Sequence, residues 1–281
     1  MKFLILSLFI GLTIITDAQN MGLNPLDQTW EVNATFNHDF FIGGYVRVRE
    51  LQSDGDKLSL GNDLGMKDWN SASLEIVRFF RNHSGVRASF EYFIFNGSSI
   101  INRDIWFNAT HLKGSDGLSI YQTQQFRGQL CYERPFHLVP NLRTICIVGL
   151  LYDGLIFRIR GTTLPDTQRN ESYEDFISQA LPYPQLGLRI EKELTAKSSL
   201  TVEIKGTWIP LFKSFFIEGG HMFLHYYAMN INISYRYHIK TFYFQPGIHY
   251  RLLKTYENSG EDTNDFFISS GGVNLTAGIS F

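Results

Sequence analysis

The strongest constraint on this chain is the pattern of residues 271–281. Apolar side chains occupy every second position of this segment: Val273, Leu275, Ala277, Ile279 and Phe281. Glycine, asparagine, threonine and serine fill the positions between them. Strict alternation with a period of two predicts a β-strand that has an apolar medium on one face and water on the other.

Nine further segments between turn signals are interpreted as strands, and most of them alternate in the same way. The ten predicted strands cover residues 40–50, 71–81, 86–96, 118–134, 143–160, 183–193, 199–209, 223–237, 241–253 and 271–281. The second segment is too irregular to assign its faces, and the fifth is apolar on both faces and has room for a bulge. Ten strands are therefore predicted, with eight or twelve as alternatives.

The connections between these segments alternate between long and short. The long ones are 51–70, 97–117, 161–182 and 257–266, the tight ones are 82–85, 195–198 and 238–240, and 135–142 and 211–222 lie between these extremes. Membrane-spanning barrels have short periplasmic turns, longer extracellular loops and an even strand number. The pattern predicts an all-β, closed antiparallel transmembrane β-barrel. A soluble sandwich also alternates and stays as the alternative fold.

The beginning of the chain agrees with export from the cytoplasm. A basic start, an apolar run over residues 3–15 and a small-residue cleavage site predict a signal peptide over residues 1–18, although a buried helix is the alternative. We expect a short periplasmic segment over residues 19–29 and the barrel domain over residues 30–281. No run reaches the roughly 18 consecutive apolar residues of a membrane-spanning helix. The net charge of −2 gives no reason to expect nucleic acid as a partner.

The polar faces of the predicted strands carry charges of both signs. The predicted lumen-lining residues are Arg47, Arg49, Arg87, Glu91, Arg127, Glu133, Arg189, Glu191, Glu203, Lys205, Arg236, His249 and Arg251. A barrel of about ten strands has a narrow interior that side chains partly fill, and buried charges there need partners. The set predicts either a charged plug or a narrow path for small solutes. The excess of arginine would favour anionic solutes.

The two cysteines flank the predicted turn at residues 135–142 almost symmetrically. Cys131 and Cys146 could therefore face each other on adjacent strands. An oxidising compartment permits a disulfide between them. Two free thiols are the alternative.

Candidate chemistry is confined to the predicted outer rim. His221 and His225 lie near one strand end, with Asp153, Asp262 and Asp265 near others. A histidine–carboxylate pair there could activate water for lipid or peptide hydrolysis, but no motif places the partners within hydrogen-bond reach. Residues 54–65 are rich in acidic and amide side chains but do not match the spacing of an EF-hand loop. We predict no metal and no cofactor.

The chain resembles the small bacterial outer-membrane β-barrel proteins. The resemblance is carried by the predicted signal peptide, the alternating segments and residues 274–281, which resemble the signal read by the barrel-assembly machinery, with Phe281 at its end. It implies a monomer in the outer membrane of a Gram-negative cell, with lipid and that machinery as partners. It brings no enzyme or porin signature. Our main hypothesis is a non-enzymatic barrel, either structural or a narrow solute path. Hydrolysis at the rim and adhesion through the loops are the alternatives.

Overall fold

The structure is a computed structural model. It describes residues 29–50, 55–80, 83–139, 142–165, 168–176, 182–217, 220–258 and 262–280. The predicted signal peptide, residues 19–28 and Phe281 lie outside the described residues, so those assignments stay predictions. Among the described residues, no helix has the length and apolar character needed to cross a membrane.

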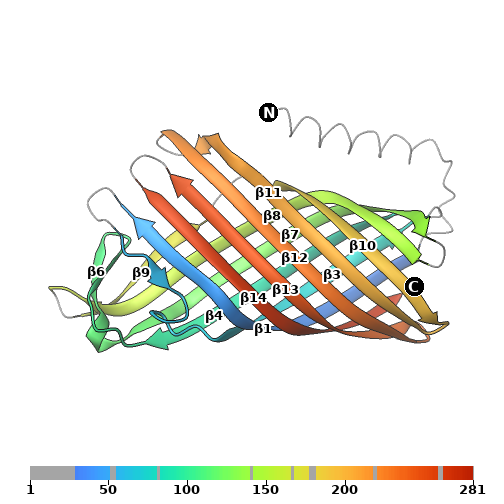
Figure 1. Ribbon diagram of the computed structural model, residues 1–281, viewed down its shortest axis with the longest axis horizontal. Helices are drawn as coiled ribbons and strands as arrows, with labels where there is room; N and C mark the ends of the chain where they lie inside the picture. Colours follow the sequence, from blue (N-terminus) through green and yellow to red (C-terminus); the bar gives the residue numbers. More distant parts are fainter. Residues whose placement is uncertain are drawn as a thin grey trace.

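Ten strands form one closed ring (Figure 1). In ring order they are β1 (Thr29–Arg49), β3 (Asp68–Phe79), β4 (Gly85–Ser99), β7 (Leu118–Val139), β8 (Leu142–Thr163), β10 (Tyr183–Thr195), β11 (Ser198–Ile217), β12 (Gly220–Ile239), β13 (Phe242–Asn258) and β14 (Thr263–Ser280). Every neighbouring pair is antiparallel, and the β14–β1 and β8–β10 pairings close the ring. The predicted closed antiparallel barrel is confirmed.

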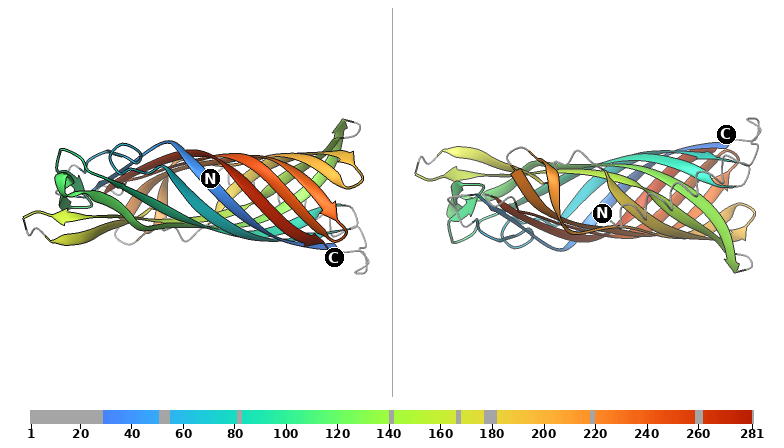
Figure 2. Two further views of the ribbon diagram at one scale, coloured as in Figure 1. Left: turned by 90° about the horizontal axis from the view of Figure 1, so that it is seen from below. Right: turned by 90° about the horizontal axis from the view of Figure 1, so that it is seen from above.

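The two ends of the barrel differ, as the views in Figure 2 show. At the turn end, short connections join β3 to β4, β7 to β8, β10 to β11 and β12 to β13, and β1 begins beside the end of β14. The opposite end, here called the loop end, carries β2 (Leu58–Ser59), β5 (Ile105–Phe107), β6 (Thr110–Lys113), a short 3₁₀ helix η2 (Gly114–Asp116) and β9 (Arg169–Phe176). This asymmetry is typical of outer-membrane barrels, in which the loop end is extracellular.

The outer face of the barrel is apolar along the middle of the strands. Its exposed side chains include Phe36, Phe40, Ile42, Leu74, Ile76, Phe90, Ile94, Leu130, Leu150, Leu186, Leu188, Ile204, Ile233, Ile248, Val273 and Leu275. So large an apolar surface is unfavourable in water and is the lipid-facing band of a membrane barrel. A sandwich would bury such a face against a second sheet, so this alternative is excluded.

Some strands are longer than the sequence predicts. β1 begins at Thr29 rather than at residue 40, and the residues before 40 already alternate between polar inward and mostly apolar outward positions. β11 runs to Ile217 and β12 starts at Gly220, so the predicted connection at 211–222 is a tight hairpin. Tertiary pairing extends the strands into segments whose local sequence reads as a turn.

A bulge at Ile42 of β1 changes which side chains face inward. One extra residue relative to β14 reverses the facing of every later side chain. Beyond the bulge Val46 and Val48 are fully buried, while Arg49 is exposed. The prediction that Arg47 and Arg49 line the lumen is therefore wrong: the alternation is present, but its two faces are exchanged.

Candidate functional site

The interior nearest the turn end is occupied by a cluster around Glu31 of β1. Arg236 of β12 lies 3.2 Å from this carboxylate (Nη1 to Oε2), and Tyr243 of β13 donates its hydroxyl to it at 2.6 Å. Arg236 also donates from Nε to Gln245 at 2.8 Å. β12 and β1 are separated by two strands of the ring, so the contact spans part of the lumen.

A larger cluster of ions lies further inside. The six-residue ionic cluster consists of Glu75, Arg87, Glu133, Arg189, Glu203 and Lys205. Arg87 Nε lies 2.7 Å from Glu133, and Lys205 lies 3.0 Å from Glu203. Arg189 contacts both carboxylates, at 3.3 Å from Glu203. Within the cluster three cations meet three carboxylates. Arg189 also contacts Glu191, which lies 3.3 Å from Arg143, so each charge has a partner of opposite sign.

A third cluster surrounds Asp39 and Glu91. Arg251 of β13 lies 2.7 Å from Glu91 and 3.6 Å from Asp39. His249 Nε2 lies 2.9 Å from the Asp39 carboxylate, to which Ser270 donates its hydroxyl at 2.7 Å. Asp39 is fully buried and His249 is nearly so. These partners compensate the cost of placing a carboxylate in the interior.

Asp153 of β8 is the centre of a fourth polar group. Its carboxylate contacts Arg127 at 2.9 Å and accepts hydrogen bonds from Tyr226 at 2.6 Å and Gln125 at 2.7 Å. The Arg127 guanidinium lies over the ring of Phe93, 5.3 Å from its centroid. Beyond this ring most inward side chains are apolar, and Glu257 of β13 is a buried carboxylate near the mouth. The interior from the turn end to the ring of Phe93 is called the ionic half.

Contacts in the ionic half join walls that are nearly opposite. Arg251 of β13 and Glu91 of β4 are four strands apart in a ring of ten, and so are Arg87 of β4 and Glu203 of β11, which lie 3.9 Å apart. Two strands on opposite walls would be five apart. Side chains that meet across this span fill the lumen rather than line an open channel.

The interior at the loop end is packed with apolar side chains. This apolar half includes Val46, Val48, Leu58, Leu60, Leu64, Met66, Trp69, Phe95, Ile101, Ile105, Phe107, Leu112, Leu118, Ile120, Leu151, Leu155, Phe157, Ile159, Phe176, Leu224, Leu253, Phe266 and Ile268. The ring of Phe157 lies 5.8 Å from that of Phe266 and 6.1 Å from that of Phe107. Many members come from the β1–β3 and β4–β7 connections, so these connections fold into the barrel mouth.

One glycine shows how tightly a connection is held there. A Cβ at Gly97 of β4 would lie only 2.5 Å from the backbone oxygen of Leu64 in the β1–β3 connection. No other residue type allows this approach without displacing the backbone. The apolar half therefore closes the mouth with a packed core.

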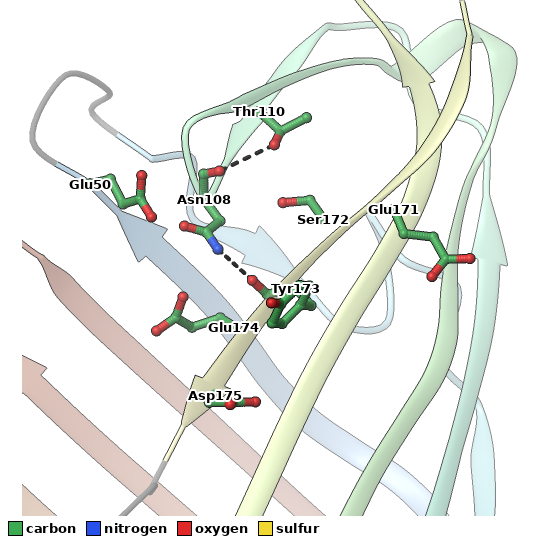
Figure 3. Close-up of a pocket in the computed structure, with 8 residues that line it drawn as sticks. All are labelled: Glu50, Asn108, Thr110, Glu171, Ser172, Tyr173, Glu174 and Asp175. Carbon is green, nitrogen blue, oxygen red and sulfur yellow. Dashed lines mark hydrogen bonds between the residues drawn. The ribbon is translucent and has the colours of Figure 1, made fainter.

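Outside this core, a cavity of about 430 Å³ opens between β9, the end of β1 and the β5–β6 hairpin (Figure 3). Its lining consists of Glu50, Asn108, Thr110, Glu171, Ser172, Tyr173, Glu174 and Asp175. Asn264 of β14 donates to Glu174 at 2.7 Å and so ties β9 to the ring. Desolvation and the nearby Glu257 raise the pKa of Glu174 to about 7. Glu174 is therefore partly protonated at neutral pH.

The predicted lumen residues other than Arg47 and Arg49 all lie on inward positions and are buried or half-buried. Ten belong to the polar groups described above. The eleventh, Glu191, lies 2.9 Å from Arg189. The structure thus brings these residues together, and it supplies the contacts that one sequence cannot.

Several partners were missed from the sequence. Glu31, Asp39 and Glu75 stand in segments to which the sequence analysis assigns no faces, and Asp153, which it expects at the rim, is buried. The available signal was the period of two itself, because Glu31 and Asp39 stand an even number of residues apart on the face opposite Phe36.

The predicted disulfide is wrong. Cys131 is buried on an inward position of β7, whereas Cys146 is exposed on an outward position of β8, and both thiols are free. In the strand register Cys131 stands opposite Gly149, and Cys146 stands opposite Arg134. The two cysteines are therefore not opposite each other in the actual register, although their spacing around the turn is nearly symmetric.

The predicted rim chemistry is not assembled among the described residues. His225 is in register with Tyr256 on the outer face, whereas Asp153 is buried inside. The side chain of His221 lies outside the described residues. Asp265 accepts a hydrogen bond from Tyr45.

Residue 54 of the acidic connection at 54–65 lies outside the described residues, and ion pairs hold the described part, residues 55–65. Arg103 lies 2.9 Å from Asp56 and 3.6 Å from Asp63. Within the part of the chain that the structure describes, no group of three or more His, Cys, Asp and Glu side chains is placed to hold a metal ion.

Comparison with solved structures finds other barrels. The chain is similar to the outer-membrane protease OmpT of Escherichia coli, with 12% identity over 94% of this chain and 99% of that one and a TM-score of 0.49. The translocator domain of the autotransporter NalP of Neisseria meningitidis has 13% identity over 95% of this chain and 94% of its own, with a TM-score of 0.43. The toluene transporter TodX of P. putida has 6% identity over 91% of this chain and 90% of its own, with a TM-score of 0.34.

The closed ring and the outward apolar band decide the class. This chain is a β-barrel protein of the outer membrane. No protein-family model and no curated protein matches the sequence. The identities and TM-scores above are too low to transfer a site or an activity. What this outer-membrane barrel does must be inferred from its own interior and surfaces.

Proposed function

We propose that this protein is a closed, non-conducting outer-membrane barrel that serves as a rigid scaffold for its loop end. The β1–β3 and β4–β7 connections together with β9 (Arg169–Phe176) are called the extracellular cap. The observation that carries the proposal is the filled interior. Charged side chains meet across the ionic half, as Arg251 and Glu91 do at 2.7 Å, and apolar side chains pack the mouth. A solute would have to displace both.

The cap supports the scaffold role. The β1–β3 and β4–β7 connections contribute fully buried side chains, such as Leu60 and Phe107, to the same core as the ring strands. Loops that share a core with a barrel hold a fixed shape. The cap therefore presents a defined surface, which includes the acidic cavity beside Glu174, to the outside of the cell.

The narrow anion path is supported less well. It would require uncompensated arginines along the interior, yet Arg87, Arg189 and Arg236 each contact a carboxylate. Anions would meet a neutral interior and then an apolar mouth. For the hydrolase alternative, His225 and Asp265 face outward on the same wall, but Tyr256 stands between them in the strand register. Among the described residues no hydrogen bond joins the two, and Asp265 accepts one from Tyr45 instead.

A flux measurement tests the proposal. The purified protein is reconstituted into liposomes, and the efflux of chloride and of small sugars is compared with that of liposomes carrying an open porin and of protein-free liposomes. We expect efflux equal to that of protein-free liposomes. Selective efflux of chloride would contradict the scaffold proposal and favour the anion path.

A further inference from the structure

The cavity at the loop end is lined by all three parts of the extracellular cap. Glu50 belongs to the β1–β3 connection, Asn108 lies in the turn between β5 and β6, and Glu174 belongs to β9. Figure 3 shows the two carboxylates and the side-chain oxygen of Asn108 turned toward a common space. Four of the eight lining residues are carboxylates, and none is lysine, arginine or histidine. The cavity is therefore rich in acceptors and poor in positive charge.

Asn108 presents an oxygen, and not an NH₂ group, to this space. Its Nδ2 donates a hydrogen bond to the backbone oxygen of Tyr173, which can only accept, so the orientation of the amide is fixed. Among the described residues, Oδ1 of Asn108 is buried and has no hydrogen-bond partner. A buried acceptor without a donor is unfavourable, which indicates that a ligand supplies the donor.

The two carboxylates that face Asn108 also lack a positive partner. Glu50 forms no ion pair and no hydrogen bond among the described residues. Glu174 accepts a hydrogen bond from Nδ2 of Asn264 at 2.7 Å. Asn264 is only 6% exposed, and its own Oδ1 has no hydrogen-bond partner in the described part of the chain. Acceptors thus outnumber donors around Glu174, and two negative charges are not compensated by an ion pair.

Two arginines of β8 lie on the other face of the sheet. In the β8–β9 register Glu174 is opposite Phe157, which is buried inside, whereas Arg158 is opposite Tyr173 on the outward face. The Arg158 guanidinium lies over the Tyr173 ring, 5.3 Å from its centroid. Arg160 is opposite an outward glutamate of β9. These arginines therefore compensate the outer face of β9 and not Glu174.

The state of Glu174 agrees with the lack of a cation. Desolvation and then Glu257 raise its pKa to about 7, and Asp262 and Glu50 act in the same direction, whereas the hydrogen bond from Asn264 opposes them. A cation bound beside Glu174 would favour the ionised carboxylate and release its proton. Binding of a cation should therefore depend on pH.

The acceptors suit a primary ammonium group better than a metal ion. An alkylammonium group has three N–H donors, no acceptor and a full positive charge. A calcium ion needs six to eight oxygen ligands within about 2.6 Å, and no acidic or histidine group of the described chain is placed to provide such a site. The volume of about 430 Å³ lies in the range of small-molecule sites, roughly 300–1,000 Å³.

We propose that this cavity binds a small linear diamine. One primary ammonium group donates hydrogen bonds to Glu50, Glu174 and Oδ1 of Asn108, and the second lies beside Asp175, which lines the same cavity. The binding involves the extracellular cap alone, so it does not depend on whether the lumen conducts.

Isothermal titration calorimetry of the full-length protein in a non-ionic detergent, with 1,4-diaminobutane as the probe, tests the proposal. Glu50→Gln should weaken binding about tenfold, because it removes a charged acceptor. Asp104→Asn changes the net charge equally at an exposed position of the β4–β7 connection outside the cavity, and affinity should stay within about twofold. Equal losses in both variants, or no loss in Glu50→Gln, would overturn the assignment.

A comparison of two monovalent cations needs only the wild type. Tetramethylammonium has no N–H donor, so it should bind at least about tenfold more weakly than n-butylammonium. Equal binding of the two would reduce the site to general electrostatic attraction and overturn the role of the three acceptors. Calcium chloride at millimolar concentration should not displace 1,4-diaminobutane, and displacement by it would reveal a metal site instead.

The dependence on pH tests the role of Glu174. The amine stays charged between about pH 6 and about pH 8, so a change in affinity over this range reports the protein. Affinity should rise by up to about tenfold from the lower to the higher pH, as for one carboxyl group with a pKa of about 7 that must ionise. In Glu174→Gln this rise should vanish. A wild-type affinity that does not change with pH would contradict the contact with Glu174.

Discussion

The two halves of the interior are stabilised by different interactions, ion pairs in one and apolar packing in the other. In the ionic half, cations from one wall meet carboxylates from another, as Arg87 meets Glu133 at 2.7 Å. In the apolar half, rings such as Phe157 and Phe266 pack at 5.8 Å. Burial of a charge is costly unless a partner of opposite charge lies beside it, whereas burial of an apolar side chain requires only that its shape fits its neighbours. The ionic half should therefore respond sharply to the loss of a single charge.

Removal of one interior carboxylate gives the largest expected effect. Glu133→Gln removes a carboxylate that Arg87 and Arg189 share and leaves them Glu203 and Glu75, so the free energy of unfolding should fall by about 3–5 kcal/mol. Urea unfolding in lipid vesicles, followed by tryptophan fluorescence, measures it. Glu193→Gln, at an exposed position of β10, is the control and should change stability by less than about 0.5 kcal/mol. Equal effects of both variants would show that the ionic half is not buried.

Truncation of one ring in the apolar half should have the next largest effect. Phe157 is fully buried among Phe107, Phe176 and Phe266. Phe157→Ala should lower the free energy of unfolding by about 3–4 kcal/mol, because it leaves a cavity. The same urea titration measures this change. A loss below about 1 kcal/mol would mean that the mouth is not a packed core.

The contrast between the halves explains what the sequence could reveal. In β10, alternation places Leu188 outside and Arg189 inside, and the structure agrees. In β8, Leu151 and Leu155 point inward and Leu150 outward, so both faces are apolar and no alternation of polarity is visible. A period of two reports the facing only where the two surroundings differ in polarity.

Other features were beyond one sequence for a different reason. The bulge at Ile42 exchanges the faces of Arg47 and Val46. Gly43 and Gly44 directly follow it and are compatible with a bulge, but they do not fix the register. Partners such as Glu31 and Arg236 are 205 positions apart in the chain, so only the closed ring brings them together. Register and long-range pairing are tertiary properties, whereas facing is local.

The cap should respond to pH through Glu174, which lies outside the ring. Its pKa is about 7 in the folded protein against an ordinary value of 4.5, because burial and Glu257 oppose ionisation. A raised carboxyl pKa means that the folded cap binds the proton more tightly than the open cap. Stability is therefore lost as the pH rises from the ordinary value through about 7.

Hydrogen exchange of β9 (Arg169–Phe176) measures this effect after correction for intrinsic rates. Protection should be lower at about pH 8 than at about pH 5. In Glu174→Gln the difference between the two conditions should largely vanish. Glu50 and Asp262 are further carboxyl groups that act on Glu174. Equal or greater protection of the wild type at the higher pH would contradict the assignment of the pH response to Glu174.

The smallest effect is expected at the cysteines, which report inside and outside directly. Cys146 faces outward and Cys131 is buried, so an apolar maleimide should label Cys146 in the folded barrel and Cys131 only after unfolding. Cys146→Ser should change stability by less than about 0.5 kcal/mol. Mass spectrometry of the tryptic peptides identifies the labelled residue. Preferential labelling of Cys131 in the folded protein would contradict the assignment of Cys131 to the inward face of β7.

Single-channel recording in planar bilayers tests the closed interior most directly. The wild-type protein should give no discrete conductance steps at any applied voltage, because the ionic and apolar halves both obstruct the path. A stable, repeatable conductance of the wild type would show a continuous aqueous path and would contradict the account.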